Sequence, residues 1–314
     1  VEYAKSRKAF GQSISDFGSI QDKLASAAIL TYTLDSTCYS VIGKQTEAIN
    51  ELDKNDPEYY VKQGNTTEQY IAENSIVKVY GSEAAEQLID HCFQIFGGYG
   101  FIEEYPMAQA YRDNRINKIW EGTNEINRML CGRAMITKAL SGEIGFKEYL
   151  EKVDGYCKDN LHSGYEGDYK SEVECIEAAK AVYAICLNES LSKHGQDIGT
   201  EQMIIENLAN ILIFSYVADS TLSRVMQNKD LYNKKNQIVP ELCAKVYTAE
   251  QGIRVMEYAN KILNSIYDGD IPDNLNVKLD VLKKRLSLST DTIGFKKIIG
   301  EKVVEAGGYP VQSF

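Results

Sequence analysis

One acidic residue of this chain occupies a position where a catalytic base would be useful. Glu121 lies between an apolar-periodic, helical stretch and Gly122, whose missing side chain permits close approach of another group. A carboxylate in a desolvated pocket has a raised pKa and is therefore a stronger base, able to remove a weakly acidic proton from carbon. Because Glu121 is one of 45 acidic residues, most of which we expect to be solvated, its neighbours must decide its role.

Glycines and an arginine upstream have the chemistry to hold a phosphate. Residues 94–100 read Gln-Ile-Phe-Gly-Gly-Tyr-Gly, and the paired glycines predict the end of a helix. Main-chain N–H groups can approach a phosphate closely where no side chain intervenes. Near the start, Arg7 precedes Phe10 and Gly11, and the rigid donor fork of arginine suits a phosphate. Alone, residues 94–100 are explained equally well as a helix terminator and turn.

Taken together, residues 1–140 resemble the C-terminal helical domain of the acyl-CoA dehydrogenases. Three motifs occur in the order and spacing of that family, namely residues 7–11, 94–100 and 119–128. The resemblance implies oxidation of an acyl-CoA to the trans-2-enoyl-CoA, as in fatty-acid β-oxidation, with Glu121 removing the α-proton while hydride passes to FAD. It also implies that the backbone N–H of Glu121 and a flavin hydroxyl bind the thioester carbonyl. Nitroalkane oxidases share the fold but use aspartate as the base, so a glutamate favours the thioester branch.

The resemblance further implies a cofactor site shared by two subunits. Arg7 would pair with the FAD pyrophosphate of the neighbouring subunit, and Phe10 would pack beside the adenine. Trp120 and Gly122 would contact the substrate, although packing in the core explains Trp120 equally well. The implied partners are an acyl-CoA, an electron-transferring flavoprotein and a second copy of the chain in a homodimer. The remaining cofactor-binding positions would be Gln94, Gly97, Gly98, Thr123 and Glu125.

Two residues depart from the family pattern. Gly18 stands where many short- and medium-chain members carry a glutamine that offers its amide to the cofactor. Glu125 also occupies a frequent glutamine position, and a carboxylate beside a phosphate would be repelled unless it points away. At Gly18 the chain resembles the very-long-chain members more closely than the shorter-chain ones.

The predicted fold is all-α, in two helical bundles, with an up-and-down four-helix bundle over residues 1–140 and a second bundle over 141–314. Apolar positions recur at helical spacing, and only five prolines interrupt the chain. In the first part we expect a polar loop around Gly64, a helix opened by Pro106, and a helix capped by Thr123. The long helices of this part are expected at about 20–54, from Thr66 or Thr67 to 96, and at 123–140.

Beyond residue 141 the sequence predicts a helical extension. Residues 141–145 make the best boundary, and 146–170 are polar and weakly periodic. The extension has no counterpart in the short- and medium-chain enzymes, and by position and length it resembles the extra helical region of very-long-chain acyl-CoA dehydrogenases. Further helices are expected near 171–194, 201–227, 241–268, 274–286 and 290–305.

Charge and composition restrict the classes of partner. The net charge of −11 argues against nucleic acid or an anionic membrane as a generic partner, since both attract cationic surfaces. Residues 141–170 also lack the cationic face that membrane attachment through an amphipathic helix would use. Seven cysteines without a CxxC pair suggest no disulfide framework, no metal site is expected, and the compartment should be reducing. We expect the bacterial cytoplasm in preference to the mitochondrial matrix.

The chain opens with helical sequence at Val1 and no capping residue before it. We therefore expect a polypeptide that lacks the family's N-terminal and middle domains and that is folded but inactive alone. The alternative function is a catalytically silent scaffold or assembly protein, in which the extension would be the docking element. Retention of Glu121 favours the enzyme, because helix packing does not require an acid there.

Overall fold

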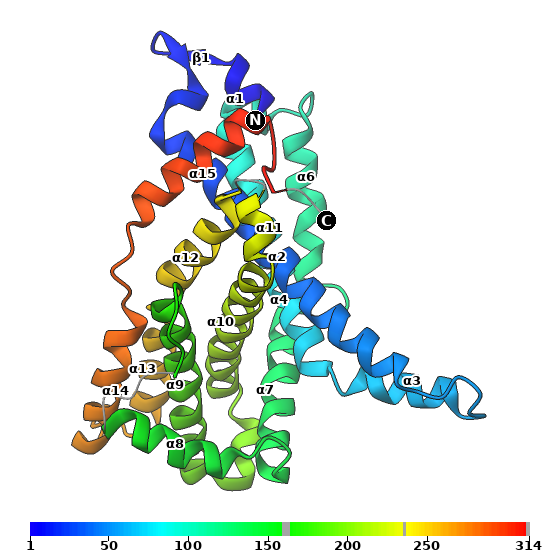
Figure 1. Cartoon of the computed structure of the whole chain (residues 1–314), viewed down its shortest axis with the longest axis vertical. Coiled ribbons are helices and arrows are strands. Elements are labelled where there is room, and N and C mark those ends of the chain that lie inside the picture. The colour runs from blue at the N-terminus through cyan, green and yellow to red at the C-terminus, as the bar shows by residue number, and fades with distance from the viewer. Residues whose placement is uncertain (159–163, 235–236, 312–314) are drawn as a thin grey trace.

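The computed structural model describes residues 1–158, 164–234 and 237–311, and it confirms the all-α prediction (Figure 1). Within these residues the only strands are β1 (Lys8–Ala9) and β2 (Gln12–Ser13), which pair antiparallel with Lys8 opposite Ser13. Phe10 and Gly11 form the turn between them, with φ of 52° and 87°. Two successive positive φ values match the twist of a two-residue hairpin, which explains the glycine.

The first part of the chain contains two long antiparallel helices, α2 and α4, with α7 packed against α4. The predicted start at Pro106 and the predicted Thr123 cap are both confirmed. The helices are α1 (Glu2–Ser6), α2 (Gly18–Asn50), α3 (Tyr59–Glu68), α4 (Ile71–Phe96), α5 (Gly98–Phe101), α6 (Pro106–Arg115) and α7 (Asn124–Ser141), with 3-10 turns η1 (Ile14–Asp16) and η2 (Ile116–Lys118).

The polar loop expected around Gly64 is wrong, because α3 runs through it. Thr66 and Thr67 are not caps either, since their hydroxyls donate to the carbonyls of Lys62 and Gln63 one turn earlier within the helix. Threonine can satisfy its hydroxyl inside a helix in this way, so its presence alone does not locate a helix start. The structure instead begins α4 after Tyr70, without a side-chain cap.

The second part is helical throughout most of its described residues. Residues 146–158, which looked only weakly periodic, form a helix, and the helix expected over 241–268 is divided at Ile253. The elements are α8 (Phe146–Lys158), α9 (Lys170–His194), η3 (Gly195–Thr200), α10 (Gln202–Gln227), α11 (Lys229–Lys234), α12 (Val239–Gly252), α13 (Arg254–Ile266), α14 (Asp273–Leu286) and α15 (Thr292–Ala306).

The two parts share one hydrophobic core. Helix α10 packs on both α2 and α7, and α15 returns to lie along α2 near the N-terminus (Figure 1). Buried side chains also join across the parts, since the Tyr32 and Tyr232 hydroxyls are 3.3 Å apart and the Tyr80 and Tyr247 rings meet edge to face. The core cluster includes residues from before and after position 141. The division of the chain at that position stays a prediction.

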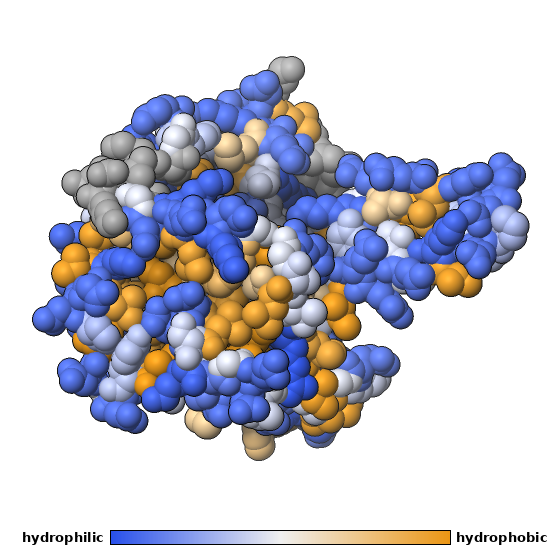
Figure 2. Space-filling view, turned by 90° about the horizontal axis from the view of Figure 1, so that it is seen from below, coloured by the Kyte–Doolittle hydropathy of each residue, from blue (hydrophilic) through white to orange (hydrophobic). Residues whose placement is uncertain are grey.

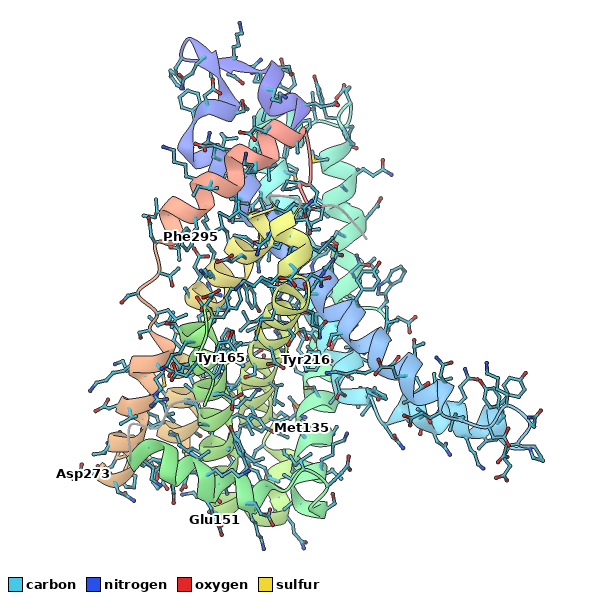
Figure 3. The ribbon with its side chains drawn as sticks, in the orientation of Figure 1. Met135, Glu151, Tyr165, Tyr216, Asp273 and Phe295 are labelled. Carbon is cyan, nitrogen blue, oxygen red and sulfur yellow. The ribbon has the colours of Figure 1, made fainter. Side chains whose placement is uncertain are left out.

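A recess lies on the lower side of the molecule. A cleft of about 310 Å³ is enclosed by α4, α7, α8, α9 and α10, and its lining includes Met135 of α7 and Tyr216 of α10 (Figure 3). Seen from below, apolar side chains gather near the middle of this face (Figure 2). None of the candidate residues from the sequence lines this cleft. Among the described helices, none combines the length and apolar character needed to cross a membrane.

Candidate functional site

The backbone at Glu121 has an unusual conformation. Glu121 has a φ of 54° and Gly122 a φ of 78°, so two successive residues are in the left-handed region. Glycine adopts this region freely, whereas a glutamate does so at an energetic cost. A side chain on Gly122 would also place its Cβ 3.1 Å from the Asn127 amide nitrogen. Gly122 therefore allows both the turn and the approach of Asn127.

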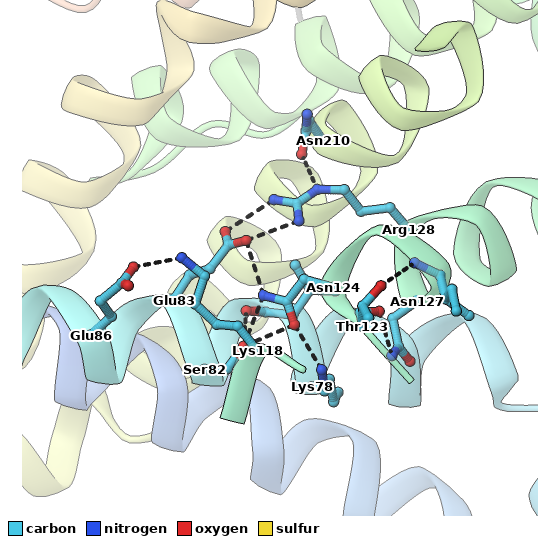
Figure 4. Close-up of polar contacts among 12 residues, drawn as sticks. Lys78, Ser82, Glu83, Glu86, Lys118, Thr123, Asn124, Asn127, Arg128 and Asn210 are labelled. Atoms are coloured by element: carbon cyan, nitrogen blue, oxygen red, sulfur yellow. Dashed lines mark hydrogen bonds and ion pairs between the residues drawn. The ribbon is translucent and has the colours of Figure 1, made fainter. Parts of the chain in front are cut away.

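Two donors hold the carbonyl groups of this turn (Figure 4). The side-chain amide of Asn127 donates to the carbonyls of Gly122 at 2.9 Å and Thr123 at 3.1 Å, with a longer contact to that of Glu121 at 3.3 Å. Lys78, on α4, donates from Nζ to the Gly122 carbonyl at 2.7 Å. The turn that carries the candidate base is thus tied to two helices.

The turn leads directly into the N-terminus of α7. The Thr123 hydroxyl accepts a hydrogen bond from the backbone N–H of Ile126, which satisfies one of the free donors of the first helical turn. Glu125 accepts from its own backbone N–H and from the Thr123 hydroxyl, and these bonds hold the pKa of Glu125 below its usual range. The positive end of the helix dipole thus lies beside Glu121 and Glu125.

A polar network extends from this helix start into the interior (Figure 4). Asn124, which is only 2% exposed, accepts from Lys78 at 2.8 Å and donates to Glu83 at 3.1 Å. Arg128 makes a bidentate pair with Glu83, at 2.9 and 3.0 Å, and its Nε donates to Asn210 on α10 at 2.7 Å. Bidentate bonds between an arginine and a carboxylate are strong and directional. The network therefore links α4, α7 and α10.

Glu121 itself is exposed, which differs from the desolvated pocket expected for a base. Packing of Trp120 in the core is also wrong as an explanation, since that side chain is 56% exposed. Other exposed apolar side chains lie close to the turn in sequence, on the segment before it and on the first turns of α7, namely Ile116, Ile119, Ile126 and Leu130. Within this chain, the candidate base lies beside exposed apolar side chains rather than in a closed pocket.

The other candidate residues gather at the C-terminal end of α4, whereas the Glu121 turn contacts α4 near its middle. A cleft of about 680 Å³ is lined by residues that include Arg7, Phe10, Gly97 and Gly98. The Arg7 guanidinium lies over the Tyr99 ring, 5.5 Å from its centroid, whereas Phe10 is 98% exposed at the hairpin turn. No atom lies within 4 Å of where a Cβ would stand on either glycine. This cleft therefore combines a cation, an exposed ring and accessible backbone.

The predicted residues thus form two groups. The first group comprises Arg7, Phe10, Gly97 and Gly98, which line the cleft just described. Gln94 is exposed on the last turn of α4 and does not line this cleft. The second group comprises Trp120, Glu121, Gly122, Thr123 and Glu125, none of which lines that cleft. The hairpin and the end of α4 lie at the top of Figure 1, whereas α7 runs through its lower half.

Sequence reasoning missed the residues that hold the turn in place. Asn127 and Arg128 belong to the motif that drew attention to Glu121, yet their types gave no indication of their partners. The sequence shows two asparagines at the start of α7, and only the structure shows that both are buried and therefore need hydrogen-bond partners. Lys78 and Asn210 could not be found, because each is far in sequence from the group that it contacts.

Comparison with known proteins identifies relatives of this chain. Two family models, both described as "Acyl-CoA dehydrogenase, C-terminal domain", match residues 1–136 and 178–284. A probable acyl-CoA dehydrogenase of Bacillus subtilis is 28% identical over 296 residues, which cover 94% of this chain and 49% of that protein. The very long-chain specific acyl-CoA dehydrogenase of Bos taurus mitochondria is 32% identical over 249 residues, covering 73% of this chain and 35% of that protein.

Among solved structures, the acyl-CoA dehydrogenase of Bacillus anthracis complexed with FAD superposes with a TM-score of 0.88 at 29% identity. That match covers 99% of this chain and 52% of the other. The chain therefore spans about half the length, or less, of the relatives that it matches here. Because family models match on both sides of residue 141 and the helices superpose almost completely, the chain belongs to the acyl-CoA dehydrogenase family, within its C-terminal helical region.

Proposed function

We propose that this chain is the C-terminal helical part of an FAD-dependent acyl-CoA dehydrogenase that converts an acyl-CoA to the trans-2-enoyl-CoA. The observation that carries the proposal is the Glu121 turn, in which an acid is kept in a left-handed conformation by donors from two helices. Strained backbone that neighbouring groups hold in place is common at catalytic positions. An acid required only for solubility would not need this arrangement.

The proposed role of Glu121 is to remove the α-proton of the thioester. Its carboxylate is exposed, so the desolvation that strengthens a base must come from the substrate and from protein outside this chain. Support comes from the exposed apolar side chains around the turn, Trp120 among them, since an apolar surface of this kind favours burial against another group. The N-terminus of α7 would add a positive potential beside the enolate that develops.

The described residues fit an FAD dinucleotide. Arg7 offers a fork of donors, Phe10 an exposed ring and Gly97 with Gly98 accessible backbone, all around one cleft. FAD, when bound, supplies the acceptor for the hydride of the β-carbon. Because Thr123 and Glu125 lie away from this cleft, we propose that the two groups meet on one cofactor across a homodimer interface. Gln94 would add its amide at the edge of the cleft.

Glu125 would have to avoid the phosphates of such a cofactor. Its carboxylate accepts hydrogen bonds from its own N–H and from the Thr123 hydroxyl, and these bonds hold the charge at the start of α7. Trp120 and Gly122 would face the acyl group. For re-oxidation of the cofactor we propose an electron-transferring flavoprotein.

The test is substitution of the base in the full-length protein. We expect Glu121→Gln to bind a normal amount of FAD but to lose about 1000-fold of the acyl-CoA-dependent dye reduction, the order of effect that removal of a general base has. Glu104→Gln, at another exposed acid, is the control and should keep full activity. Palmitoyl-CoA and phenylpropionyl-CoA would serve as substrates.

Two outcomes would count against the proposal. Unchanged activity in Glu121→Gln would refute the assignment of the base. A wild-type protein that contains FAD but reduces no dye with any acyl-CoA would favour the scaffold function instead. In that case the extension, rather than the Glu121 turn, would be the part to examine for partners.

A further inference from the structure

We propose that Lys78 and Asn127 are positioning residues that fix the Glu121 turn, and that Asn210 on α10 supports them through Arg128 and Glu83. The consequence for catalysis rests on the proposed function, whereas the positioning itself rests on geometry alone. The inference assigns part of the orientation of the candidate base to a helix beyond residue 141.

The first step concerns the carbonyl of Gly122. It accepts from Lys78 at 2.7 Å and from Asn127 at 2.9 Å, so two donors from different helices converge on one oxygen. The Glu121 backbone is held at a φ of 54°, a conformation that a glutamate leaves readily unless its surroundings fix it. Loss of either donor should therefore release the turn toward ordinary conformations.

The second step concerns the hydrogen-bond partners of Lys78. Its ammonium group is partly buried and donates to two neutral acceptors, the Gly122 carbonyl and the Asn124 side chain, and among the described residues it forms no close pair with a carboxylate. Burial lowers the pKa of Lys78, although the carboxylates of Glu125, Glu83 and Glu121 act in the opposite direction. A lysine on an ordinary surface would keep its charge in water, so this placement is specific to the turn.

The third step leads from the turn to α10. Glu83 accepts from Asn124 at 3.1 Å while it is paired with both terminal nitrogens of Arg128. The remaining Nε of Arg128 donates to Asn210 at 2.7 Å. The Arg128 side chain is only 14% exposed, so water competes weakly for these bonds. Asn210 thus fixes the guanidinium that orients Glu83 and, through it, the first residue of α7.

Hydrogen exchange in the 314-residue chain tests the positioning without any activity measurement. The amides of Ile126 and Asn127 bond to Thr123, and their protection reports on the end of the turn. We expect Lys78→Met and Asn127→Leu each to accelerate exchange in residues 119–128 by about tenfold, the effect of losing a charge-assisted or multiply shared hydrogen bond. Asn210→Leu should give a smaller acceleration of about threefold, because it acts through two further groups.

Lys138→Met is the matched control. Lys138 also donates from Nζ to a backbone carbonyl of another segment, that of Gln69, but at the far end of α7. The Lys138→Met substitution should leave hydrogen exchange in residues 119–128 unchanged. Equal exchange rates in wild type, Lys78→Met and Asn127→Leu would overturn the proposal. An acceleration by Lys138→Met as large as that of the two variants would also overturn it, because such a result would indicate general loosening of α7. Unchanged exchange in Asn210→Leu alone would overturn the role given to α10.

Kinetics of the full-length enzyme supply the second readout. Lys78→Met and Asn127→Leu should lower kcat by about tenfold or more while FAD content and KM for acyl-CoA stay near wild type, because the base is present but misplaced. Lys78→Arg should recover part of the lost rate, since it keeps a cationic donor. A raised KM with unchanged kcat would contradict positioning. If the wild-type enzyme shows no acyl-CoA oxidation, the proposed function fails, and the exchange experiment still decides the positioning.

Discussion

Glu121 occupies a backbone conformation that its side chain disfavours. A left-handed conformation costs an L-residue roughly 1–2 kcal/mol, and glycine is free of this cost. The Glu121 side chain is exposed, so its removal sacrifices no packing. We therefore expect Glu121→Gly to raise the free energy of unfolding by about 0.5–1 kcal/mol, measured by urea denaturation, after allowance for the greater chain entropy of glycine in the unfolded state.

Glu104→Gly is the matched control for this prediction. Glu104 is also an exposed turn residue, but it is not among the residues with positive φ. Glycine there should lower stability slightly through unfolded-state entropy. A stabilised control, or a destabilised Glu121→Gly, would mean that backbone strain does not explain the conformation at Glu121. The expected gain in stability of Glu121→Gly would be accompanied by loss of the candidate base.

Glu172 makes the stability of the chain depend on pH. This carboxyl is 5% exposed in the first turn of α9, and burial raises its pKa. Since the folded pKa lies above the unfolded one, the folded state binds the proton more tightly, and stability from this group is present at low pH and lost as pH rises through the folded value. Glu172→Gln should therefore raise the melting temperature at pH 7 and change it little near pH 4.

An outcome in which Glu172→Gln lowers the melting temperature at both pH values would show that the carboxylate is needed as an acceptor. Glu174→Gln, two residues along the same helix and less buried, serves as the comparison. Thermal unfolding followed by circular dichroism at several pH values provides the measurement.

At the scale of elements, small residues decide how closely helices approach. Gly300 of α15 faces α2, and a Cβ there would lie 2.7 Å from the carbonyl oxygen of Gln21. A backbone oxygen cannot rotate away as a side chain does, so α15 would have to shift outward. We expect Gly300→Ala to lower the free energy of unfolding by about 1–3 kcal/mol, as in other overpacked cores.

Gly43→Ala tests the opposite case. Gly43 is exposed inside α2, and no atom lies within 4 Å of the point that its Cβ would occupy. Alanine there should stabilise the protein by roughly 0.5–1 kcal/mol through helix propensity alone. If both substitutions stabilise the chain, close packing of α15 on α2 is not a determinant of the fold. Chemical denaturation of both variants alongside wild type gives the comparison.

Close packing is also found at the break between α12 and α13. Gly252 ends α12, and a Cβ on it would meet the Cys175 sulfur at 2.7 Å and the Leu286 carbonyl at 3.3 Å. The helix therefore approaches α9 and the end of α14 at a point where only glycine fits. The periodicity of the sequence predicts continuous helix there, because a pattern of apolar residues carries no information about a neighbouring helix.

For the whole molecule, buried thiols on both sides of residue 141 report whether the core unfolds as one unit. Cys131 and Cys243 are 1% and 0% exposed, and burial raises the pKa of both thiols, that of Cys131 to about 12. Both should resist alkylation until the chain unfolds. Because their helices share one core, we expect both thiols to become reactive at the same urea concentration in pulsed alkylation read by mass spectrometry.

The half-buried Cys38, Cys92 and Cys157 provide the internal reference, since they should react earlier through local motion. Exposure of Cys131 at a clearly lower urea concentration than Cys243 would contradict a single unit. That result would support separate unfolding of the parts before and after residue 141.

The sequence by itself determined the class of fold, most helix positions, the family and the residue that stands as candidate base. The fold class and the helix positions follow from local properties: apolar spacing fixes helix faces, glycine and proline fix helix ends, and Thr123 caps α7 because it needs only the neighbouring backbone. The family and the candidate base came instead from a resemblance, since Glu121 and Gly122 belong to one short motif whose residues are adjacent in the sequence.

Only the tertiary structure decided how that motif is held. The donors on the Gly122 carbonyl come from residues 78 and 127, and the network reaches α10 at Asn210. A hydrogen bond between groups far apart in sequence depends on how helices pack, and packing depends on shapes that no local pattern records. For the same reason the sequence could not show that Glu121 is exposed in this chain or that the cofactor-binding candidates separate into two groups.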